Sequence, residues 1–316
     1  MSLMAEIFSS LLHDTRSSKV RPFEYWREPE WPASASVKSP DMADSVASAS
    51  AEMIRSRQNT RLKDLRQRLM HPGIGEDGLI AIEGDHLVQE AERSGLRFDT
   101  VFLREDRVAE RAQSFRGHVR VFTVTVDAFD HACATDSPQG VAALVEAPHW
   151  TLESLLAADE ARLVILTGLQ DPGNVGTIVR SAEAFAASGI LLTPGSVSPW
   201  NQKALRASAG SSFRLPVISL VDVSILRRLG EKLIPMYACA ADRGASIFDA
   251  DLRGPKAFVI GNEGAGIPDE ILSFCQGTLY IPCPGNVESL NAAIAASILL
   301  YEASRQRSVA SPQGKP

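Results

Sequence analysis

Three loops in the second half of the chain carry the polar residues whose types and spacing suggest chemistry. They span residues 169–180, 257–268 and 281–291, and each follows a hydrophobic run that is typical of a buried strand. Glycine and proline recur in all three loops, and these residues hold irregular backbone that a ligand can approach closely. Because open parallel sheets bind ligands at the carboxyl ends of their strands, the three loops together predict one binding site.

The first and last loops indicate what this site binds. Arg180 is expected on the first turn of a helix over residues 177–187. A cation there meets the positive end of the helix dipole, which predicts an anionic partner such as a phosphate. Ser289 and Asn291 are expected at the start of a helix over residues 290–303, where unpaired backbone N–H groups can face a ligand.

The second half of the chain contains no histidine, and this limits the reactions that the predicted site can catalyse. All six histidines precede residue 150: His13, His71, His86, His118, His131 and His149. The site therefore has no histidine general base of its own and depends on Arg, Asn, Ser and Glu263, which lies among glycines. This set favours a charged or phosphate-bearing substrate over hydrolysis. The GxGxxG match at residues 73–78 follows an expected helix and precedes a strand, the reverse of a dinucleotide fingerprint, which argues against a dehydrogenase.

Length and composition indicate a reduced, cytoplasmic globular protein. The chain has 316 residues, a length that is enough for two domains with a large core. Of these residues 45% are hydrophobic and 22% are charged, which is typical of a globular protein. The four cysteines form no CxxC pair, so no structural metal is expected. We find no run of 18 apolar residues and no secretory signal in the first ten residues, and we therefore expect neither a membrane span nor secretion.

The order of expected elements divides the chain into four parts. Residues 1–50 are rich in Ser, Ala and Pro and are expected to form an irregular arm. Alternating strands and helices predict a small α/β domain over residues 51–147 and a larger one, with a parallel sheet covered on both faces, over residues 160–305. Residues 306–316 are expected to be a polar tail.

A basic segment opens the smaller domain. Six basic residues lie between positions 51 and 72, against two acidic ones, in a chain whose net charge is −6. An RNA-binding surface and a solvated helix face both fit this pattern. The residues that we expect to contact RNA phosphates are Arg55, Arg57, Asn59, Arg61 and Lys63.

Three ordered motifs carry a family resemblance. They are Asn174-x-Gly176-x-x-x-Arg180, Ile260-Gly-Asn-Glu-Gly-x-Gly266, and Ile281-Pro followed by Asn286-x-x-Ser289-Leu-Asn291. They resemble the SpoU (TrmH-like) RNA 2′-O-ribose methyltransferases over residues 162–303, including the segment 203–210. The resemblance implies a trefoil-knotted α/β domain that binds S-adenosylmethionine, needs no metal and acts as a homodimer. More loosely, Ser56-x-x-Asn59, Ile82-Glu-Gly84 and Ser137-Pro-Gln-Gly-Val141 resemble the ribosomal-protein-like substrate-binding domain of many family members.

The same resemblance assigns roles to individual residues. It implies that backbone at Gly261, Ile281 and Leu290 holds S-adenosylmethionine. The catalytic residues that it implies are Asn174, Arg180, Glu263, Ser289 and Asn291. Arg180 is expected to anchor the phosphate beside the reacting ribose and to assist deprotonation of the 2′-hydroxyl. Asn174, Asn291 and Ser289 are expected to orient this hydroxyl. The sequence leaves open which group takes the proton.

The function predicted is S-adenosylmethionine-dependent methyl transfer to a ribose 2′-hydroxyl of RNA. Ribosomal RNA is favoured, because a separate N-terminal domain offers extra surface for a large structured target. A transfer RNA 2′-O-methyltransferase and a non-catalytic RNA-binding member stay open as alternatives. The full set of expected catalytic residues argues against the latter, since a binding protein has no need of it.

Overall fold

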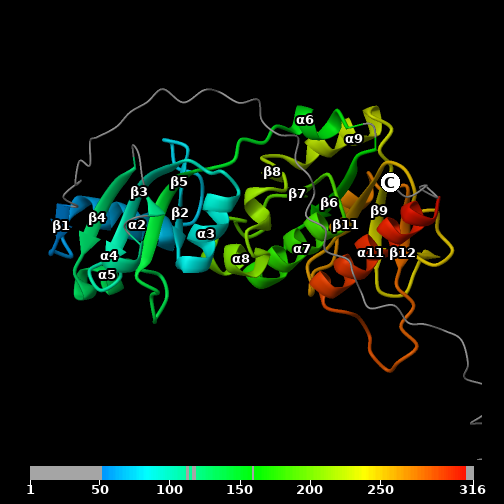
Figure 1. The fold of residues 1–316 in the computed structure, drawn as a ribbon. Helices are drawn as coiled ribbons and strands as arrows, with labels where there is room; N and C mark the ends of the chain where they lie inside the picture. The colour runs from blue at the N-terminus through cyan, green and yellow to red at the C-terminus, as the bar shows by residue number, and fades with distance from the viewer. Residues whose placement is uncertain (1–51, 112–113, 116–118, 159, 311–316) are drawn as a thin grey trace, which may run out of the picture. The chain divides into compact units, whose positions relative to one another are not determined.

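The computed structural model describes residues 52–111, 114–115, 119–158 and 160–310 (Figure 1). The arm expected at residues 1–50 and the residues after 310 lie outside this described part. Within it, no helix is both long and apolar enough to cross a bilayer.

A mixed sheet organises the N-terminal lobe, by which we mean residues 52–147. Its strand order is β1-β4-β3-β5-β2, with β5 antiparallel to both β2 and β3 and the other pairs parallel. The elements are β1 (Glu52–Ile54), α2 (Thr60–Met70), β2 (Leu79–Glu83), α3 (Asp85–Arg93), β3 (Phe98–Arg104), α4 (Val108–Arg111), β4 (Arg120–Val124), α5 (Val126–Ala132) and β5 (Val141–Glu146). Strand β1, whose three residues pair with β4, is not among the elements predicted from the sequence.

Helix α2 shows why this lobe folds as it does. The Asn59 side chain caps it by accepting a hydrogen bond from the backbone N–H of Arg61. Leu62, Leu65 and Leu69 recur at helical spacing, and all three are buried against the sheet and α5. The helix begins at Thr60, so the basic residues before it lie in the connection from β1.

A parallel sheet organises the C-terminal lobe, residues 160–310. Its strand order is β10-β12-β9-β11-β6-β7-β8, and every neighbouring pair is parallel. The elements are β6 (Arg162–Leu166), α7 (Pro172–Ala184), β7 (Gly189–Leu192), α8 (Gln202–Ser208), η2 (Ser211–Phe213), β8 (Val217–Ser219), η3 (Val223–Leu226), α9 (Arg227–Glu231), β9 (Met236–Ala240), β10 (Ala245–Ser246), β11 (Lys256–Ile260), α10 (Asp269–Leu272), β12 (Gly277–Tyr280) and α11 (Ala292–Ala310); α6 (Leu152–Leu156) precedes them.

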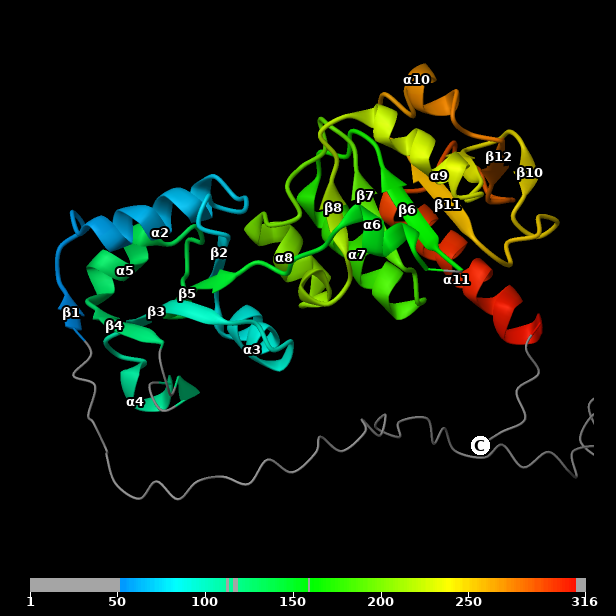
Figure 2. The same ribbon diagram turned by 90° about the horizontal axis from the view of Figure 1, so that it is seen from above.

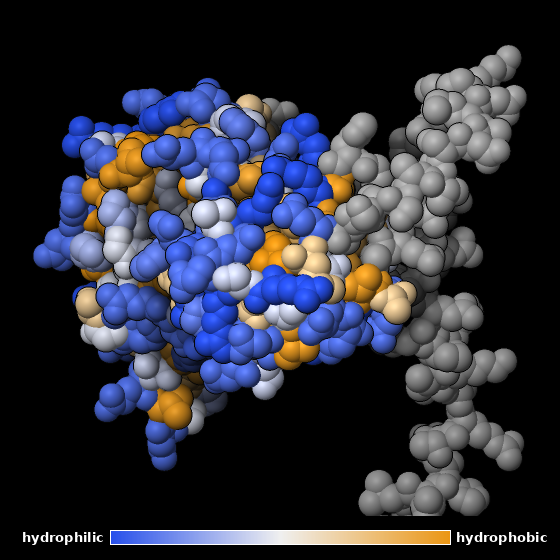
Figure 3. All heavy atoms as spheres, turned by 90° about the vertical axis from the view of Figure 1, so that its left-hand side faces the viewer, coloured by the Kyte–Doolittle hydropathy of each residue, from blue (hydrophilic) through white to orange (hydrophobic). Residues whose placement is uncertain are grey.

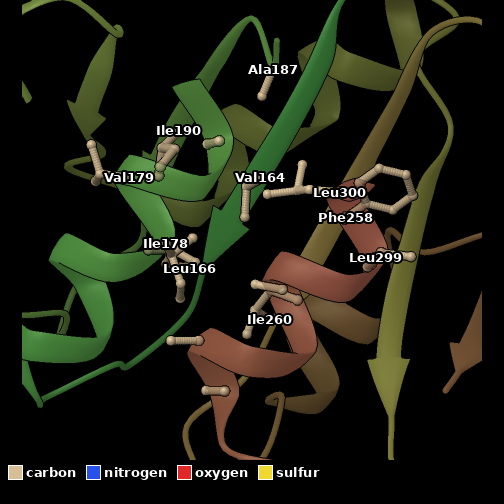
Figure 4. Packing of buried hydrophobic residues seen from close by; sticks show 14 of the residues in the cluster. Val164, Leu166, Ile178, Val179, Ala187, Ile190, Phe258, Ile260, Leu299 and Leu300 are labelled. Carbon is tan, nitrogen blue, oxygen red and sulfur yellow. The ribbon is translucent and has the colours of Figure 1, made fainter. Parts of the chain in front are cut away.

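Helices cover both faces of this sheet, as the sequence predicts. Figure 4 shows α7 and α11 side by side on one face, with Ile178 and Leu299 directed towards Leu166 and Phe258 of the strands. On the other face α6, η3, α9 and α10 pack against alternate residues of β6, β9 and β11. Strands rich in Val, Ile and Leu are therefore buried on both sides, which is the usual condition of a parallel sheet.

Helix α8 joins the two lobes and lies between their sheets (Figure 1 and Figure 2). Leu205 of α8 belongs, with Trp200 and Phe213, to the hydrophobic core on the α3 side of the N-terminal sheet. The buried Gln202 donates a hydrogen bond from Nε2 to the carbonyl of Ala81 in β2, at 2.8 Å. One hydrophobic cluster therefore contains residues of both lobes.

An ion-pair bridge reinforces this junction. Arg214 donates to Glu90 of α3 at 2.9 Å and to Glu183 of α7 at 2.7 Å. Burial opposes ionisation of Glu90, but hydrogen bonds from Arg214 and Arg93 outweigh it and hold its pKa below the usual range. The bridge ties a helix of the N-terminal lobe to the helix that carries Asn174 and Arg180.

Candidate active site

Helix α7 begins earlier than the sequence analysis expected. Asp171 caps it by accepting a hydrogen bond from the Gly173 backbone N–H at 2.7 Å, and Pro172 occupies the first helical position. Gly176 is thus a helical residue rather than part of a turn; a Cβ there would collide with the Ala204 carbonyl of α8. Arg180 lies beyond the first turn, so the prediction that it faces the positive end of the helix dipole is wrong.

Helix α11 begins later than expected. Its first residue is Ala292, and the Asn291 side chain accepts hydrogen bonds from the backbone N–H groups of Ala293 at 2.9 Å and Ile294 at 3.2 Å. Asn291 therefore caps the helix, and Ser289 precedes it instead of lying on the first turn. At its other end α11 runs to Ala310, past the expected start of a polar tail.

The loop after β11 is folded back on itself by one side chain. Asn262 accepts backbone hydrogen bonds from Gly264 and Ala265, both at 2.9 Å, and donates to the Gly168 carbonyl at 2.9 Å. A bridge between Asn262 and Gly266 brings Gly266 so near that a Cβ on Gly261 would lie 2.6 Å from it. Only glycine fits at position 261, and the turn presents the next residue but one, Glu263, to the site.

The three loops converge through hydrogen bonds between their side chains. Asn174 at the start of α7 donates from Nδ2 to Glu263 Oε1. Asn291 donates from its Nδ2 to Asn174 Oδ1, at 3.1 Å. Both polar atoms of Asn174 are engaged, so its amide is fixed in one orientation. The structure thus brings together three residues that lie as much as 117 positions apart, as the sequence predicts.

A cavity of about 830 Å³ opens beside this cluster at the carboxyl ends of β9, β11 and β12. Gly261, Ile281 and Leu290 line it together, and Glu263 and Ser289 lie on its wall. Its size falls within the usual range for a cofactor pocket. Backbone at Gly261, where a side chain is excluded, suits close approach by an adenosine-bearing ligand such as S-adenosylmethionine.

Two contributions to the site escaped sequence reasoning. The end of β9, Ala238–Ala240, lines the cavity, although its small apolar residues give no sequence signal. Lys203 of α8 donates to Asp171 Oδ1 at 2.8 Å, and its side chain lies against Gly173. This hydrogen bond and the one from Gly173 hold the pKa of Asp171 below its usual range. The Asp171-Pro172 pair is a sequence signal for a helix start and could have identified Asp171 as the cap of α7.

Arg180 is exposed and has no carboxylate within ion-pair distance in the part of the chain that the structure describes. Its charge is available to an anion that the chain does not supply. Ser289, the remaining expected catalytic residue, is exposed at the cavity wall. Within the described ranges, no group of three or more His, Cys, Asp or Glu side chains could hold a metal ion.

The expected RNA contacts of the N-terminal lobe divide into engaged and available residues. Arg57 donates from Nε to Asp127 at 2.7 Å, Asn59 caps α2, and the Arg61 guanidinium lies 4.5 Å from the ring centre of Phe122. Arg55 and Lys63 are exposed. Figure 3 views the side on which β1 and β4 lie, where hydrophilic residues cover most of the surface.

Two protein-family models match the chain. The SpoU rRNA methylase family model matches residues 161–301, and the MRM3-like substrate binding domain model matches residues 59–143. The two matches correspond to the two lobes.

Relatives and solved structures agree with these matches. The 23S rRNA (guanosine(2553)-2'-O)-methyltransferase RlmP of Bacillus subtilis is 31% identical over 251 residues, which cover 79% of this chain and 98% of that protein. An AdoMet-bound rRNA methyltransferase from Sinorhizobium meliloti superposes with a TM-score of 0.70 at 28% identity, covering 81% of this chain and 98% of that one. The SpoU methyltransferase AviRb from Streptomyces viridochromogenes, in complex with AdoMet, gives 0.69 at 26% identity, covering 80% and 100%.

Proposed function

The chain belongs to the SpoU rRNA methylase family, and from that premise we propose that it transfers a methyl group from S-adenosylmethionine to a ribose 2′-hydroxyl of ribosomal RNA. The observation that carries this proposal is the Glu263–Asn174–Asn291 hydrogen-bond chain beside the cavity lined by Gly261 and Leu290. It joins the three motif loops at one edge of the parallel sheet. The knotted path of the chain, implied by the resemblance, stays part of the proposal.

The mechanism that we propose uses fixed amides and one available cation. S-adenosylmethionine supplies an activated methyl group when bound, so the protein's task is to position the acceptor. Asn174 and Asn291 lock each other and Glu263 in place, which leaves the cluster preorganised for a ribose hydroxyl. Arg180 binds the neighbouring phosphate and stabilises the developing alkoxide, whose proton passes to solvent water, and Ser289 orients the hydroxyl from the cavity wall.

Ribosomal RNA is favoured over transfer RNA by two observations. The relative from Bacillus subtilis is described as a 23S rRNA methyltransferase and is matched over nearly its whole length. The N-terminal lobe also shares a core with the catalytic lobe, which offers a large target a second rigid surface. We propose that residues 51–147 bind RNA, with Arg55 and Lys63 contacting phosphates and Arg61 assisting, and that residues 160–305 catalyse. A ribosomal RNA substrate would place the protein in the cytoplasm.

We include a homodimer in the proposal. Leu299 and Leu300 of α11 are buried in the core of the C-terminal lobe, yet Ile294 and Tyr301 of the same helix are 52% and 54% exposed. A helix that is apolar beyond the face used by its own sheet favours a second partner. Light scattering should give twice the chain mass of 34.1 kDa; a monomer at micromolar concentration would exclude the dimer.

The function is tested by methyl transfer from tritiated S-adenosylmethionine to separated ribosomal and transfer RNA, followed by identification of the modified nucleoside. We expect a 2′-O-methylated nucleoside in ribosomal RNA. Label in transfer RNA alone would support the first alternative. Tight RNA binding without label in either would support a non-catalytic RNA-binding protein.

A further inference from the structure

Helix α8 presents two different faces. Leu205 and Gln202 are buried in the junction with the N-terminal lobe, whereas Lys203 and Arg206 are exposed. Residues three apart on a helix are neighbours on its surface, so the two cations form one ridge. The proposed function assigns no role to this ridge.

The ridge runs alongside the exposed face of α7. The Lys203 side chain passes 3.2 Å from where a Cβ of Gly173 would lie, and Gly176 packs against Ala204 and Ala207. The two helices therefore advance in the same direction. Arg180 is two turns beyond Gly173 on the same face of α7, which places it on the side of the ridge.

The charge on the ridge is available to a ligand. Lys203 pairs with Asp171, but the two side chains are 60% and 47% exposed, and such a pair is worth only about 0.2–1 kcal/mol. Within the described residues Arg206 has no carboxylate at ion-pair distance. Lys203 can exchange Asp171 for a phosphate at little cost in free energy, and until then Asp171 holds the Lys203 side chain against Gly173 at the start of α7.

We propose that Lys203 and Arg206 bind backbone phosphates of the RNA between the reacting nucleotide and the N-terminal lobe, with Asp171 holding Lys203 in place until RNA arrives. The inference rests on RNA being the substrate class of the proposed function. Helix α8 lies between the lobes, so RNA that contacts both has to pass it. Phosphate contacts position a strand without reading its sequence, which suits an exposed Lys and Arg.

The test measures binding of a short fluorescein-labelled single-stranded RNA of mixed sequence across a range of salt concentrations. Lys203→Met and Arg206→Met should each weaken binding and lower the slope of log K against log salt by about 0.7, the value for one phosphate of a single strand. Asp171→Asn keeps a good helix cap and removes the competing carboxylate, so it should tighten binding by about twofold to fivefold. Lys232→Met, an exposed lysine after α9, is the matched control and should leave both quantities unchanged.

Opposite signs for Lys203→Met and Asp171→Asn distinguish an RNA ligand from a merely structural pair. Unchanged slopes in both ridge variants would overturn the inference, as would equal losses of thermal stability in Lys203→Met and Asp171→Asn with no effect on RNA. If Lys203→Met does not fold, Arg206→Met decides alone. The titration needs no turnover: altered slopes in a protein that methylates no RNA would support the ridge and refute the proposed function.

Discussion

Asn291 performs two tasks with different atoms of one side chain, and substitutions can separate them. Its Oδ1 caps α11, and its Nδ2 donates to Asn174. Asn291→Ala removes both interactions. Asn291→Asp retains the cap, since Asp is as good a capping residue as Asn and its charge suits a helix N-terminus, but it has no amide to donate.

The magnitudes follow from these contacts. Loss of the cap in Asn291→Ala should cost about 1 kcal/mol, which lowers Tm by about 2–4 °C in a protein of this size. Asn291→Asp should melt within about a degree of the wild type, because the cap survives. Both variants should lose methyl transfer on the order of 100-fold, since Asn174 is no longer held. In Asn291→Asp, an Asn174 amide that rotates to donate to Asp turns its oxygen towards Glu263, so either orientation carries a repulsion.

Thermal unfolding and single-turnover methyl transfer on the RNA that the wild type modifies measure the two effects separately. Cofactor affinity, measured by calorimetry, serves as the control for the integrity of the cavity. Methyl transfer by Asn291→Asp at the wild-type rate would refute the proposed role of the Asn291 amide. A Tm of Asn291→Ala equal to that of the wild type would refute the role of Asn291 as the cap of α11.

Three further outcomes are expected. S-Adenosylhomocysteine at a hundred times its Kd should raise Tm by about 5–10 °C, measured by differential scanning fluorimetry, while NAD should not. Arg180→Ala should abolish methyl transfer with cofactor binding intact. Arg57→Ala with Lys63→Ala should weaken RNA binding with a salt slope lower by about 1, not 2, because Arg57 pairs with Asp127 through two of its nitrogens, a stronger pair than the single contact between Lys203 and Asp171. Arg214→Met should lower stability to urea at pH 7. Because the folded pKa of Glu90 is depressed, this contribution is fully present above the unfolded pKa of about 4.3 and is lost as the pH falls through the lower folded pKa, so the stability difference between wild type and variant should shrink as the solution is acidified below about pH 4.

The proximity of the candidate site residues is predictable from the sequence because its signals are local. Each motif couples a buried strand to a Gly- or Pro-shaped loop, and the carboxyl ends of parallel strands meet at one edge, so Asn174, Glu263 and Asn291 had to lie close together. The residues at which the helices begin and end were harder to predict from the sequence. Two glycines suggested a turn around Asn174, although the Asp171-Pro172 pair marks a helix start there.

The N-terminal lobe shows what sequence reasoning cannot reach. Arg57 pairs with Asp127, 70 positions away, and the Arg61 guanidinium stacks on Phe122. Neither partner has any pattern relation to the basic segment, which taken alone fitted a solvated helix face better than an RNA surface. The same is true of Lys203, whose neighbour Asp171 comes from another helix. Tertiary pairing decides which cations are available, and only the fold supplies it.

The positions at which helices α7 and α11 begin also determine the geometry of the candidate site, because the residues that cap these helices also contact site residues. Asp171 caps α7 and holds Lys203, while Asn291 caps α11 and holds Asn174. If either helix began one residue later, its site residue would rotate by about 100° around the helix axis and leave the cluster. Most substitutions at these caps should therefore lower stability and activity together. Only isosteric exchanges between Asn and Asp keep the cap while changing the contact, which is why they are the decisive variants at both positions.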